Sequence, residues 1–175
     1  MMDSDFHIIV ITSPVSVPGE AAKIVDLLNT GVDFVHIRKP NRTLMDVRNL
    51  IEDIPYHLRR RLRLHDHFEL LNEMTLAGAH LNSRCPEAPA SALSLTRSCH
   101  TLKEVEESEG MEYVFLSPVY DSISKPGYKS AFAGELPAAL LRQKRVVALG
   151  GVTPDKFPEL RERGFRGAAM MGHVW

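Results

Sequence analysis

The chain has few cysteines and no long apolar run, and both absences exclude classes of protein. Its 175 residues contain only two cysteines, Cys85 and Cys99, which cannot form a disulfide framework. No run reaches the roughly 18 apolar residues that a membrane-spanning helix needs. The acidic start and the short apolar run at residues 6–11 do not form a signal peptide. We therefore expect a cytoplasmic protein with no membrane partner.

An excess of charge of one sign is also missing. The chain carries 21 Lys and Arg against 22 Asp and Glu, which gives a formal net charge of −1 at pH 7. Without a basic excess or a long basic run, the chain has no sequence-independent attraction to nucleic acid. No linker or low-complexity segment divides the sequence, so we expect one domain over residues 1–175.

What the sequence does contain is a regular alternation of two kinds of segment. Short runs rich in Val, Ile and Phe predict eight strands, at residues 6–11, 34–37, 62–64, 79–81, 93–98, 113–116, 146–149 and 167–171. Segments of helical period between them predict helices at residues 20–29, 43–54, 68–76, 101–109, 136–143 and 154–163. Parallel strands need crossover helices, and eight such units can close into a (β/α)₈ TIM barrel, an α/β fold.

Two features predict a compact version of this barrel. Residues 82–92 include Pro86 and Pro89 and are too rich in proline for a full fourth helix, so helix 4 should be reduced. The sequence ends at Trp175, directly after the eighth apolar run, so the C-terminal helix 8 should be missing or truncated. A missing helix would expose apolar surface that a second copy could cover, which makes a homodimer an open prediction.

Polar residues after the second and third strands are candidates for a site, because active sites of such barrels lie at the carboxyl ends of the strands. His36 and Arg38 fall on one face of the second strand. Arg38 could bind a phosphate or a carboxylate with its planar fork, or remain a solvated charge at the end of the strand. Asp66, next to His65, could hold a metal ion or cap the following helix.

The end of the fifth strand offers a candidate acid or base. Alternation directs Ser98 and His100 toward the barrel axis, whereas Cys99 should face the helices and belong to the core. An inward histidine at the end of a strand could transfer protons near neutral pH. The alternative is a buried histidine with a purely structural role.

Residues after the last three strands form a candidate anion site. The loop after the sixth strand carries Ser122, Ser124 and Lys125, whose hydroxyl and ammonium groups could bind an anion. Glycines after the seventh and eighth strands allow backbone N–H groups to approach a phosphate, as in many barrels. These positions are Gly150, Gly151, Met171 and Gly172. The alternative is an ordinary polar surface loop.

Taken together, the motifs resemble those of the thiamine phosphate synthase and TenI (thiazole tautomerase) family. The matching segments follow the family order at residues 32–38, 65–66, 78–81, 98–100, 117–125, 147–152 and 167–172. The resemblance implies a thiamine-biosynthesis enzyme that acts on a thiazole phosphate. It implies His100 and Lys125 as catalytic residues. It also implies substrate or phosphate binding by His36, Arg38, Ser98, Ser122, Ser124, Gly150, Gly151, Met171 and Gly172.

The departures from the family pattern concern the metal site. Synthases of this family hold Mg²⁺ with one aspartate after strand three and another after strand four. Asp66 matches the first, but Cys85 occupies the second, and a thiol is a poor ligand for Mg²⁺. Pro40 also stands where the synthases carry a lysine. Mg²⁺ is therefore expected as a cofactor only if the chain is a synthase.

Three functions follow from this pattern. The leading prediction is a thiazole tautomerase, in which His100 moves a proton within a thiazole carboxylate phosphate and no cofactor is required. The alternative is the Mg²⁺-dependent synthase, which joins a pyrimidine diphosphate to a thiazole phosphate and releases pyrophosphate. A third is a non-catalytic protein that binds thiazole or thiamine phosphates and has a regulatory role.

Overall fold

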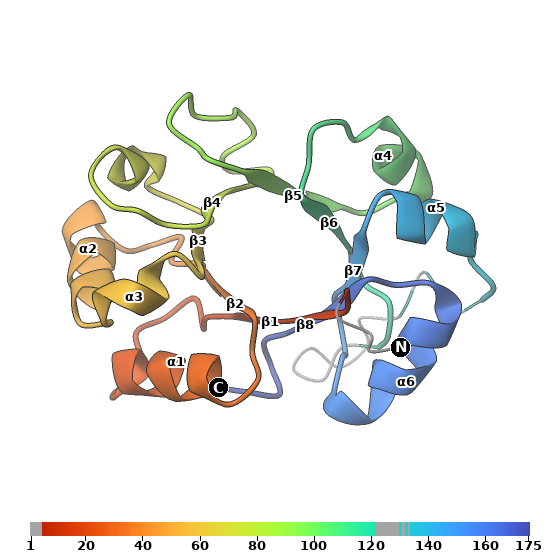
Figure 1. The fold of residues 1–175 in the computed structure, drawn as a ribbon, viewed down its shortest axis with the longest axis horizontal. Helices are drawn as coiled ribbons and strands as arrows, with labels where there is room; N and C mark the ends of the chain where they lie inside the picture. Colours follow the sequence, from red (N-terminus) through yellow and green to blue (C-terminus); the bar gives the residue numbers. More distant parts are fainter. Residues whose placement is uncertain (1–4, 122–129, 131, 133) are drawn as a thin grey trace.

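A closed barrel of eight parallel strands forms the centre of the molecule in the computed structural model, which describes residues 5–121, 130, 132 and 134–175. The strands pair in chain order, and β8 closes the barrel against β1 (Figure 1). They are β1 (His7–Ile11), β2 (Phe34–Ile37), β3 (Leu62–Leu64), β4 (Gly78–Leu81), β5 (Leu95–Cys99), β6 (Tyr113–Leu116), β7 (Val146–Ala148) and β8 (Gly167–Met170). The predicted TIM barrel is confirmed.

Alternation along the strands divides the apolar side chains into an inner and an outer core. Ile9 and Ile11 of β1 pack with Phe115 of β6 in the inner cluster. Val10, which lies between the two isoleucines, joins the larger cluster that includes residues of the surrounding helices. Because most strands are covered on both faces, most of them read as short apolar runs, and this is why the sequence located them well.

Helices surround the barrel in the described part of the chain (Figure 1). They are α1 (Glu20–Asn29), α2 (Leu44–Glu52), α3 (Tyr56–Arg59), α4 (Leu102–Glu107), α5 (Ala138–Gln143) and α6 (Phe157–Arg163), with 3₁₀ turns η1 (Phe68–Asn72) and η2 (Pro154–Lys156). At the start of α2, Thr43 Oγ1 accepts a hydrogen bond from the amide of Asp46 at 3.1 Å, and Asp46 Oδ2 accepts one from the amide of Thr43 at 3.2 Å. This capping box fixes the start of α2 where the sequence predicted it. No helix in the described part is long and apolar enough to cross a membrane.

Two helical segments differ from the prediction. The helix predicted at residues 68–76 is only the short 3₁₀ turn η1, because the chain turns sharply at His67, which has a φ of 52°. The short helix α3 was not predicted. Pro55 ends the preceding helical segment and serves as the N-cap of α3, so one apolar pattern is divided between two helices.

The expected reduction of helix 4 is present. Residues 82–94, all of which are described, contain no helix between β4 and β5, and residues 171–175 contain none after β8. Instead, the indole N–H of Trp175 donates to the carbonyl of Ile11 at 2.7 Å, and Lys23 Nζ lies 5.0 Å from the centre of the Trp175 ring. Trp175 therefore covers part of the surface beside β1 and α1.

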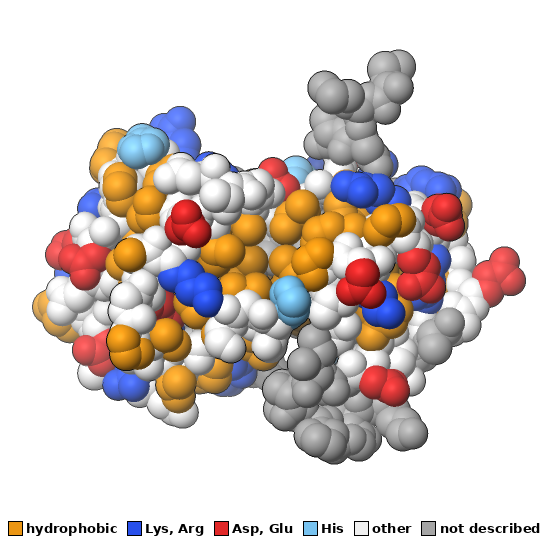
Figure 2. Space-filling view, turned by 90° about the horizontal axis from the view of Figure 1, so that it is seen from below, with side chains coloured by type: hydrophobic (Ala, Val, Ile, Leu, Met, Phe, Trp, Pro, Cys, Tyr) orange, Lys and Arg blue, Asp and Glu red, His pale blue; other side chains and the backbone are white. Residues whose placement is uncertain are grey.

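The side of the barrel that lies at the bottom of Figure 1 is shown in Figure 2. Apolar side chains gather in the middle of this face, and acidic and basic side chains are interspersed around them. No extended patch of one sign of charge is visible on it, in keeping with the formal net charge of −1.

Candidate active site

A cavity of about 390 Å³ opens at the carboxyl ends of the strands. It is lined by Ile11, Arg38, His65, Asn82, Ser83, Arg84, Ser98, His100, Phe115, Ser117, Pro118, Leu149, Gly150 and Met171. Its volume lies in the range of about 300–1,000 Å³ typical of sites for small molecules. An apolar floor with several convergent polar groups is the usual make-up of such sites.

The cavity brings together part of the predicted site. The predicted residues among its lining are Arg38, Ser98, His100, Gly150 and Met171. The predicted residues that are described but do not line it are His36, Asp66, Cys85, Gly151 and Gly172. Ser122, Ser124 and Lys125 lie outside the described residues.

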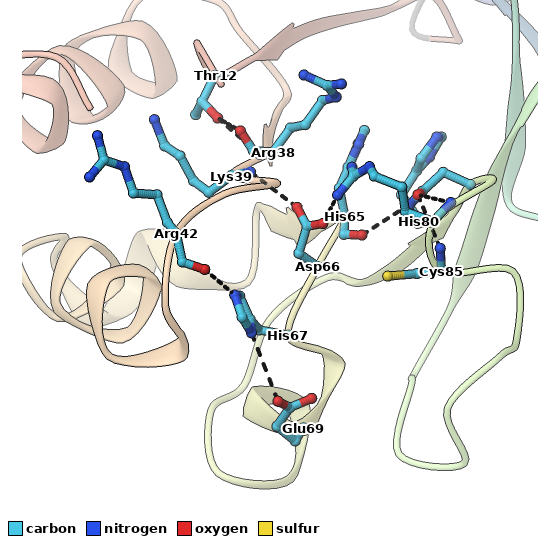
Figure 3. A network of polar contacts seen from close by, with 12 residues as sticks. Thr12, Arg38, Lys39, Arg42, His65, Asp66, His67, Glu69, His80 and Cys85 are labelled. Atoms are coloured by element: carbon cyan, nitrogen blue, oxygen red, sulfur yellow. Dashed lines mark hydrogen bonds and ion pairs between the residues drawn. The ribbon is translucent and has the colours of Figure 1, made fainter. Parts of the chain in front are cut away.

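Arg38 follows β2 and is held in place by β1. The Arg38 amide donates to Thr12 Oγ1 at 2.9 Å, and the Thr12 hydroxyl donates to the carbonyl of Arg38 at 3.3 Å (Figure 3). Burial lowers the pKa of Arg38, the nearby charge of Arg84 lowers it further, and Asp66 acts in the opposite direction. Arg38 and Arg84 both bring a guanidinium group to the cavity lining.

Asp66 is engaged by protein groups on both of its carboxylate oxygens. Oδ2 accepts a hydrogen bond from the amide of Lys39 at 3.0 Å (Figure 3), and Oδ1 forms an ion pair with Arg84. The N-cap of the following turn η1 is His67, without a side-chain cap, so Asp66 does not cap it. Of the two sequence-based alternatives for Asp66, capping is wrong.

The residues around Asp66 do not fit a Mg²⁺ ion. Mg²⁺ requires hard oxygen ligands in octahedral geometry. The Cys85 thiol, partly buried beside Asp66, has a pKa raised by burial and by the Asp66 charge, so it stays a neutral thiol. Among the described residues, the group whose ligand atoms lie within 4.8 Å of one another is His36, His65 and His80, and it excludes Asp66. Imidazoles suit Zn²⁺ or Cu²⁺ rather than Mg²⁺.

His36 lies beneath the cavity, where it belongs to a chain of hydrogen bonds inside the barrel. Its Nε2 is 2.7 Å from the Tyr113 hydroxyl, and its Nδ1 is 2.8 Å from Nε2 of His65. Burial is the main cause that lowers the pKa of both histidines well below the usual value, and the nearby His80 adds to it. Both imidazole rings are therefore neutral near pH 7. Of the two, the ring of His65 lines the cavity.

His80 occupies the neighbouring position and fixes Ser98. Its Nδ1 is 2.7 Å from Thr96 Oγ1, its Nε2 is 2.8 Å from Ser98 Oγ, and its ring stacks on that of His65 with centroids 4.1 Å apart. Burial and the charge of Arg63 lower the pKa of His80 to about 3. The three histidines together form a neutral layer inside the barrel, and His65 brings this layer to the cavity.

His100 lies at the exposed rim of the cavity after β5. Its Nδ1 is 3.3 Å from Ser117 Oγ and 3.4 Å from the carbonyl oxygen of Ser117, while its amide donates to Glu104 at 2.8 Å. The side chain is exposed, so the alternative of a buried structural histidine does not hold. Cys99, one residue earlier, is fully buried in the outer core, as the alternation predicts.

Gly151 allows two loops to pack closely. A Cβ at this position would lie 2.1 Å from the carbonyl oxygen of Asp121, and the backbone has a φ of 64°. The amide of Tyr120 also donates to the carbonyl of Gly150 at 3.0 Å. The two glycines after β7 therefore support the loop after β6, which leads directly into the predicted anion loop.

The polar residues of the cavity that the sequence-based site did not include are His65, Asn82, Ser83, Arg84 and Ser117. His65 and Asn82 directly follow β3 and β4, so the rule that located the other candidates would have included them. Arg84 lies in the proline-rich segment, where no periodic pattern fixes the path of the chain.

Comparisons with known proteins agree on one family. The family model described as thiamine monophosphate synthase matches residues 8–174. The thiamine-phosphate synthase of Syntrophomonas wolfei is 23% identical, over 98% of this chain and 89% of that protein. The thiamine phosphate pyrophosphorylase of Bacteroides thetaiotaomicron superposes with a TM-score of 0.79 at 33% identity, over 97% of this chain and 85% of that one. The Pyrococcus furiosus protein of the same name superposes with a TM-score of 0.73 at 20% identity, over 97% and 87% of the two chains, which supports the fold alone.

Proposed function

Because the chain belongs to the thiamine monophosphate synthase family, we propose that its cavity binds a thiazole carboxylate phosphate and moves a proton within it without a metal ion. This is the reaction of a thiazole tautomerase. The observation that carries the proposal is the state of Asp66, whose carboxylate is paired with Arg84 beside a neutral Cys85 thiol. A proton shift needs a positioned acid and base but no metal on a departing diphosphate.

His100 is the group that transfers the proton. Ser117 lies beside Nδ1, which leaves Nε2 of the exposed ring available to a substrate in the cavity. The neutral imidazole takes a proton from one ring atom of the substrate, and the resulting imidazolium returns a proton at another. The product has the same atoms as the substrate, and its thiazole ring has become aromatic.

The phosphate is assigned to the loops after the last three strands. Gly150 lines the cavity, Gly151 and Gly172 lie in the adjoining loops, and backbone N–H groups in such loops bind phosphate in many barrels. Ser122 and Ser124 keep their sequence-based assignment to the same phosphate, and Lys125 keeps both its place in this anion loop and the catalytic role that the resemblance implies. These loops bind the phosphate of the substrate, while His100 transfers the proton.

A synthase is the second candidate, and the names of the relatives favour it. The Bacteroides structure, 33% identical over 97% of this chain, is named thiamine phosphate pyrophosphorylase. The Mg²⁺ that a synthase uses would have Asp66 and Cys85 as its protein ligands here, and that donor pair does not fit the ion. The synthase is therefore the alternative rather than the conclusion.

A variant of His100 tests the proposal. We expect His100→Gln to reduce isomerisation of a thiazole carboxylate phosphate by roughly 10²-fold or more, because the proton carrier is lost, while substrate affinity changes little. His57→Gln is the matched control, since His57 is an exposed histidine on α3, before β3 and hence at the other end of the barrel. Full turnover of the His100 variant would show that His100 is not the group that transfers the proton. Mg²⁺-dependent formation of thiamine phosphate would establish the synthase, and binding without either reaction would indicate the regulatory alternative.

Two further assignments belong to the proposal. The cytoplasmic location follows from a biosynthetic role of the family. A homodimer would cover the apolar side chains in the middle of the face in Figure 2. Sedimentation equilibrium tests the dimer, which we expect at micromolar concentration; a mass of one chain, 19.6 kDa, would contradict it.

A further inference from the structure

We propose that Arg84 brings to Asp66 the positive charge that a divalent cation would otherwise supply, so that the cavity binds an oxyanion of its substrate between Arg84 and Arg38 without metal. The inference rests on the proposed function for the identity of this oxyanion. In a thiazole carboxylate phosphate it is the carboxylate, because the phosphate is assigned to the opposite loops. The inference adds a binding residue and a reason for metal independence.

The loop that carries Arg84 is held rigidly against the strand ends. Asn82 Oδ1 accepts hydrogen bonds from the amides of Arg84 at 3.1 Å and Cys85 at 3.2 Å. The same side chain donates through Nδ2 to the carbonyls of His65 at 3.0 Å and His80 at 2.9 Å. Asn82 therefore ties the backbone of the turn at Arg84 to the ends of β3 and β4.

Arg84 has donors left for a ligand after its contact with Asp66. A guanidinium has five N–H donors, and Nη1 alone forms the contact with Asp66 Oδ1. The Arg84 side chain stays 35% exposed and lines the cavity, whereas that of Asp66 is 10% exposed and does not. The side of this ion pair that faces the cavity is therefore the Arg84 guanidinium and not the Asp66 carboxylate.

Arg38 completes the site. It lines the same cavity as Arg84, so both guanidinium groups are available to one ligand there. Two cations face one carboxylate, so this end of the cavity has an excess of positive charge before a ligand arrives. An oxyanion placed between the two groups would relieve their repulsion and could accept paired N–H bonds from each fork.

The neighbouring Cys85 separates this arrangement from a metal site. A carboxylate at position 85 would compete with Asp66 for Arg84 and would provide a second hard ligand for a cation. The Cys85 thiol offers no hard oxygen ligand, and Arg84 is the one positive charge in contact with Asp66 among the described residues. Arg84 and Cys85 therefore both favour a site without metal: Arg84 pairs with Asp66, and Cys85 offers no second carboxylate for a cation.

Calorimetry with two probes in EDTA tests the inference. The probes are a thiazole carboxylate that lacks the phosphate group, and inorganic pyrophosphate. We expect Arg84→Gln to weaken binding of the carboxylate about tenfold or more, as for the loss of a charge-assisted hydrogen bond. Arg60→Gln, which removes an exposed positive charge before β3 at the other end of the barrel, should leave binding unchanged. Added Mg²⁺ should change the affinity less than twofold.

The two probes distinguish the source of the oxyanion. Arg84-dependent binding of the carboxylate supports the inference in the form given, and Arg84-dependent binding of pyrophosphate alone supports the oxyanion site with a diphosphate as its ligand. Binding of both probes that ignores Arg84, or that requires Mg²⁺, overturns it. Thermal melting of each variant establishes that the fold is intact.

A double variant provides the converse test. Arg84→Ala combined with Cys85→Asp removes the resident cation and adds a second carboxylate beside Asp66. We expect this variant to bind pyrophosphate at least tenfold more tightly with Mg²⁺ than in EDTA, a dependence that the parent lacks; the same dependence in the parent would contradict the inference. Because these measurements need no turnover, a protein with Arg84-dependent binding but no isomerisation would refute the proposed function alone.

Discussion

His80, which lies beneath the cavity, shows how the position of a lining residue depends on a single buried side chain. Its ring is fully buried, and both of its nitrogens contact hydroxyl groups, those of Thr96 and Ser98. A charged imidazole in this position would lose its hydration without gaining a carboxylate partner. The residue therefore helps to hold Ser98 in the cavity wall only while it is neutral.

We predict that His80 makes the fold sensitive to acid. The pKa of His80 is about 3 in the folded protein, against about 6.5 in an unfolded chain. As the pH falls below the unfolded value, the unfolded state binds the proton first. The free energy of unfolding should thus be unaffected above about pH 6.5 and should decrease below it by about 1.4 kcal/mol per pH unit from this residue, down to its folded pKa. Urea titrations at pH 7.5, 6 and 5 measure this slope.

His80→Gln is the comparison for that slope, because glutamine keeps hydrogen-bonding groups and does not titrate. The variant should lose less stability than the parent between pH 6 and pH 5. Parallel slopes in the two proteins would show that His80 does not cause the acid sensitivity.

Among the elements, strands were easier to predict than helices. Most strands are buried on both faces, so an apolar run such as Tyr113–Leu116 is recognisable without context. Helix lengths are set by the loops that join them to the barrel. Pro55 creates α3, and the left-handed turn at His67 leaves only η1 where a longer helix was expected. Neither effect follows from hydrophobic period alone.

At the level of elements, we predict that Gly78 is essential for the pairing of β4 with β5. A Cβ there would lie 2.1 Å from the carbonyl oxygen of Ser94 and 2.8 Å from Arg63, and the backbone has a φ of 149°. Gly78→Ala should lower the free energy of unfolding by about 3 kcal/mol or more, because strain and a backbone clash combine. Chemical denaturation measures the loss.

Gly110→Ala separates the two contributions. Gly110 also has a positive φ, 71°, but nothing lies within 4 Å of its added Cβ. Gly110→Ala should therefore lower the free energy of unfolding only by the conformational penalty of about 1–2 kcal/mol. Equal losses in the two variants would show that the contact with Ser94 is unimportant.

At the scale of the whole molecule, the site is assembled by the closure of the barrel. Arg38 follows β2, Ser98 and His100 come from the end of β5, and Gly150 follows β7. Sequence reasoning placed them together because parallel strands in a barrel share one carboxyl edge. It could not foresee the contact between Asp66 and Arg84. That contact depends on how the loop after β4 folds back, and this path is set by the hydrogen bonds of a single asparagine side chain rather than by a pattern of apolar residues.

The burial of His36 has a similar cause. Alternation correctly placed this residue on the inner face of β2. The depth at which it lies depends on Tyr113, whose hydroxyl contacts His36 Nε2 from the far side of the barrel. Contacts between strands that are distant in sequence determine which inward residue reaches the cavity and which remains below it.

Turnover of a thiazole carboxylate phosphate by the metal-free protein is the measurement that most directly tests a proton-transfer function for this cavity. The reaction would be followed after treatment with EDTA and again after addition of Mg²⁺, with a pyrimidine diphosphate supplied in a parallel sample. We predict the same rate of isomerisation with and without Mg²⁺, because Arg84 already neutralises Asp66. No isomerisation under either condition, with thiamine phosphate formed only when Mg²⁺ and the diphosphate are present, would contradict this function.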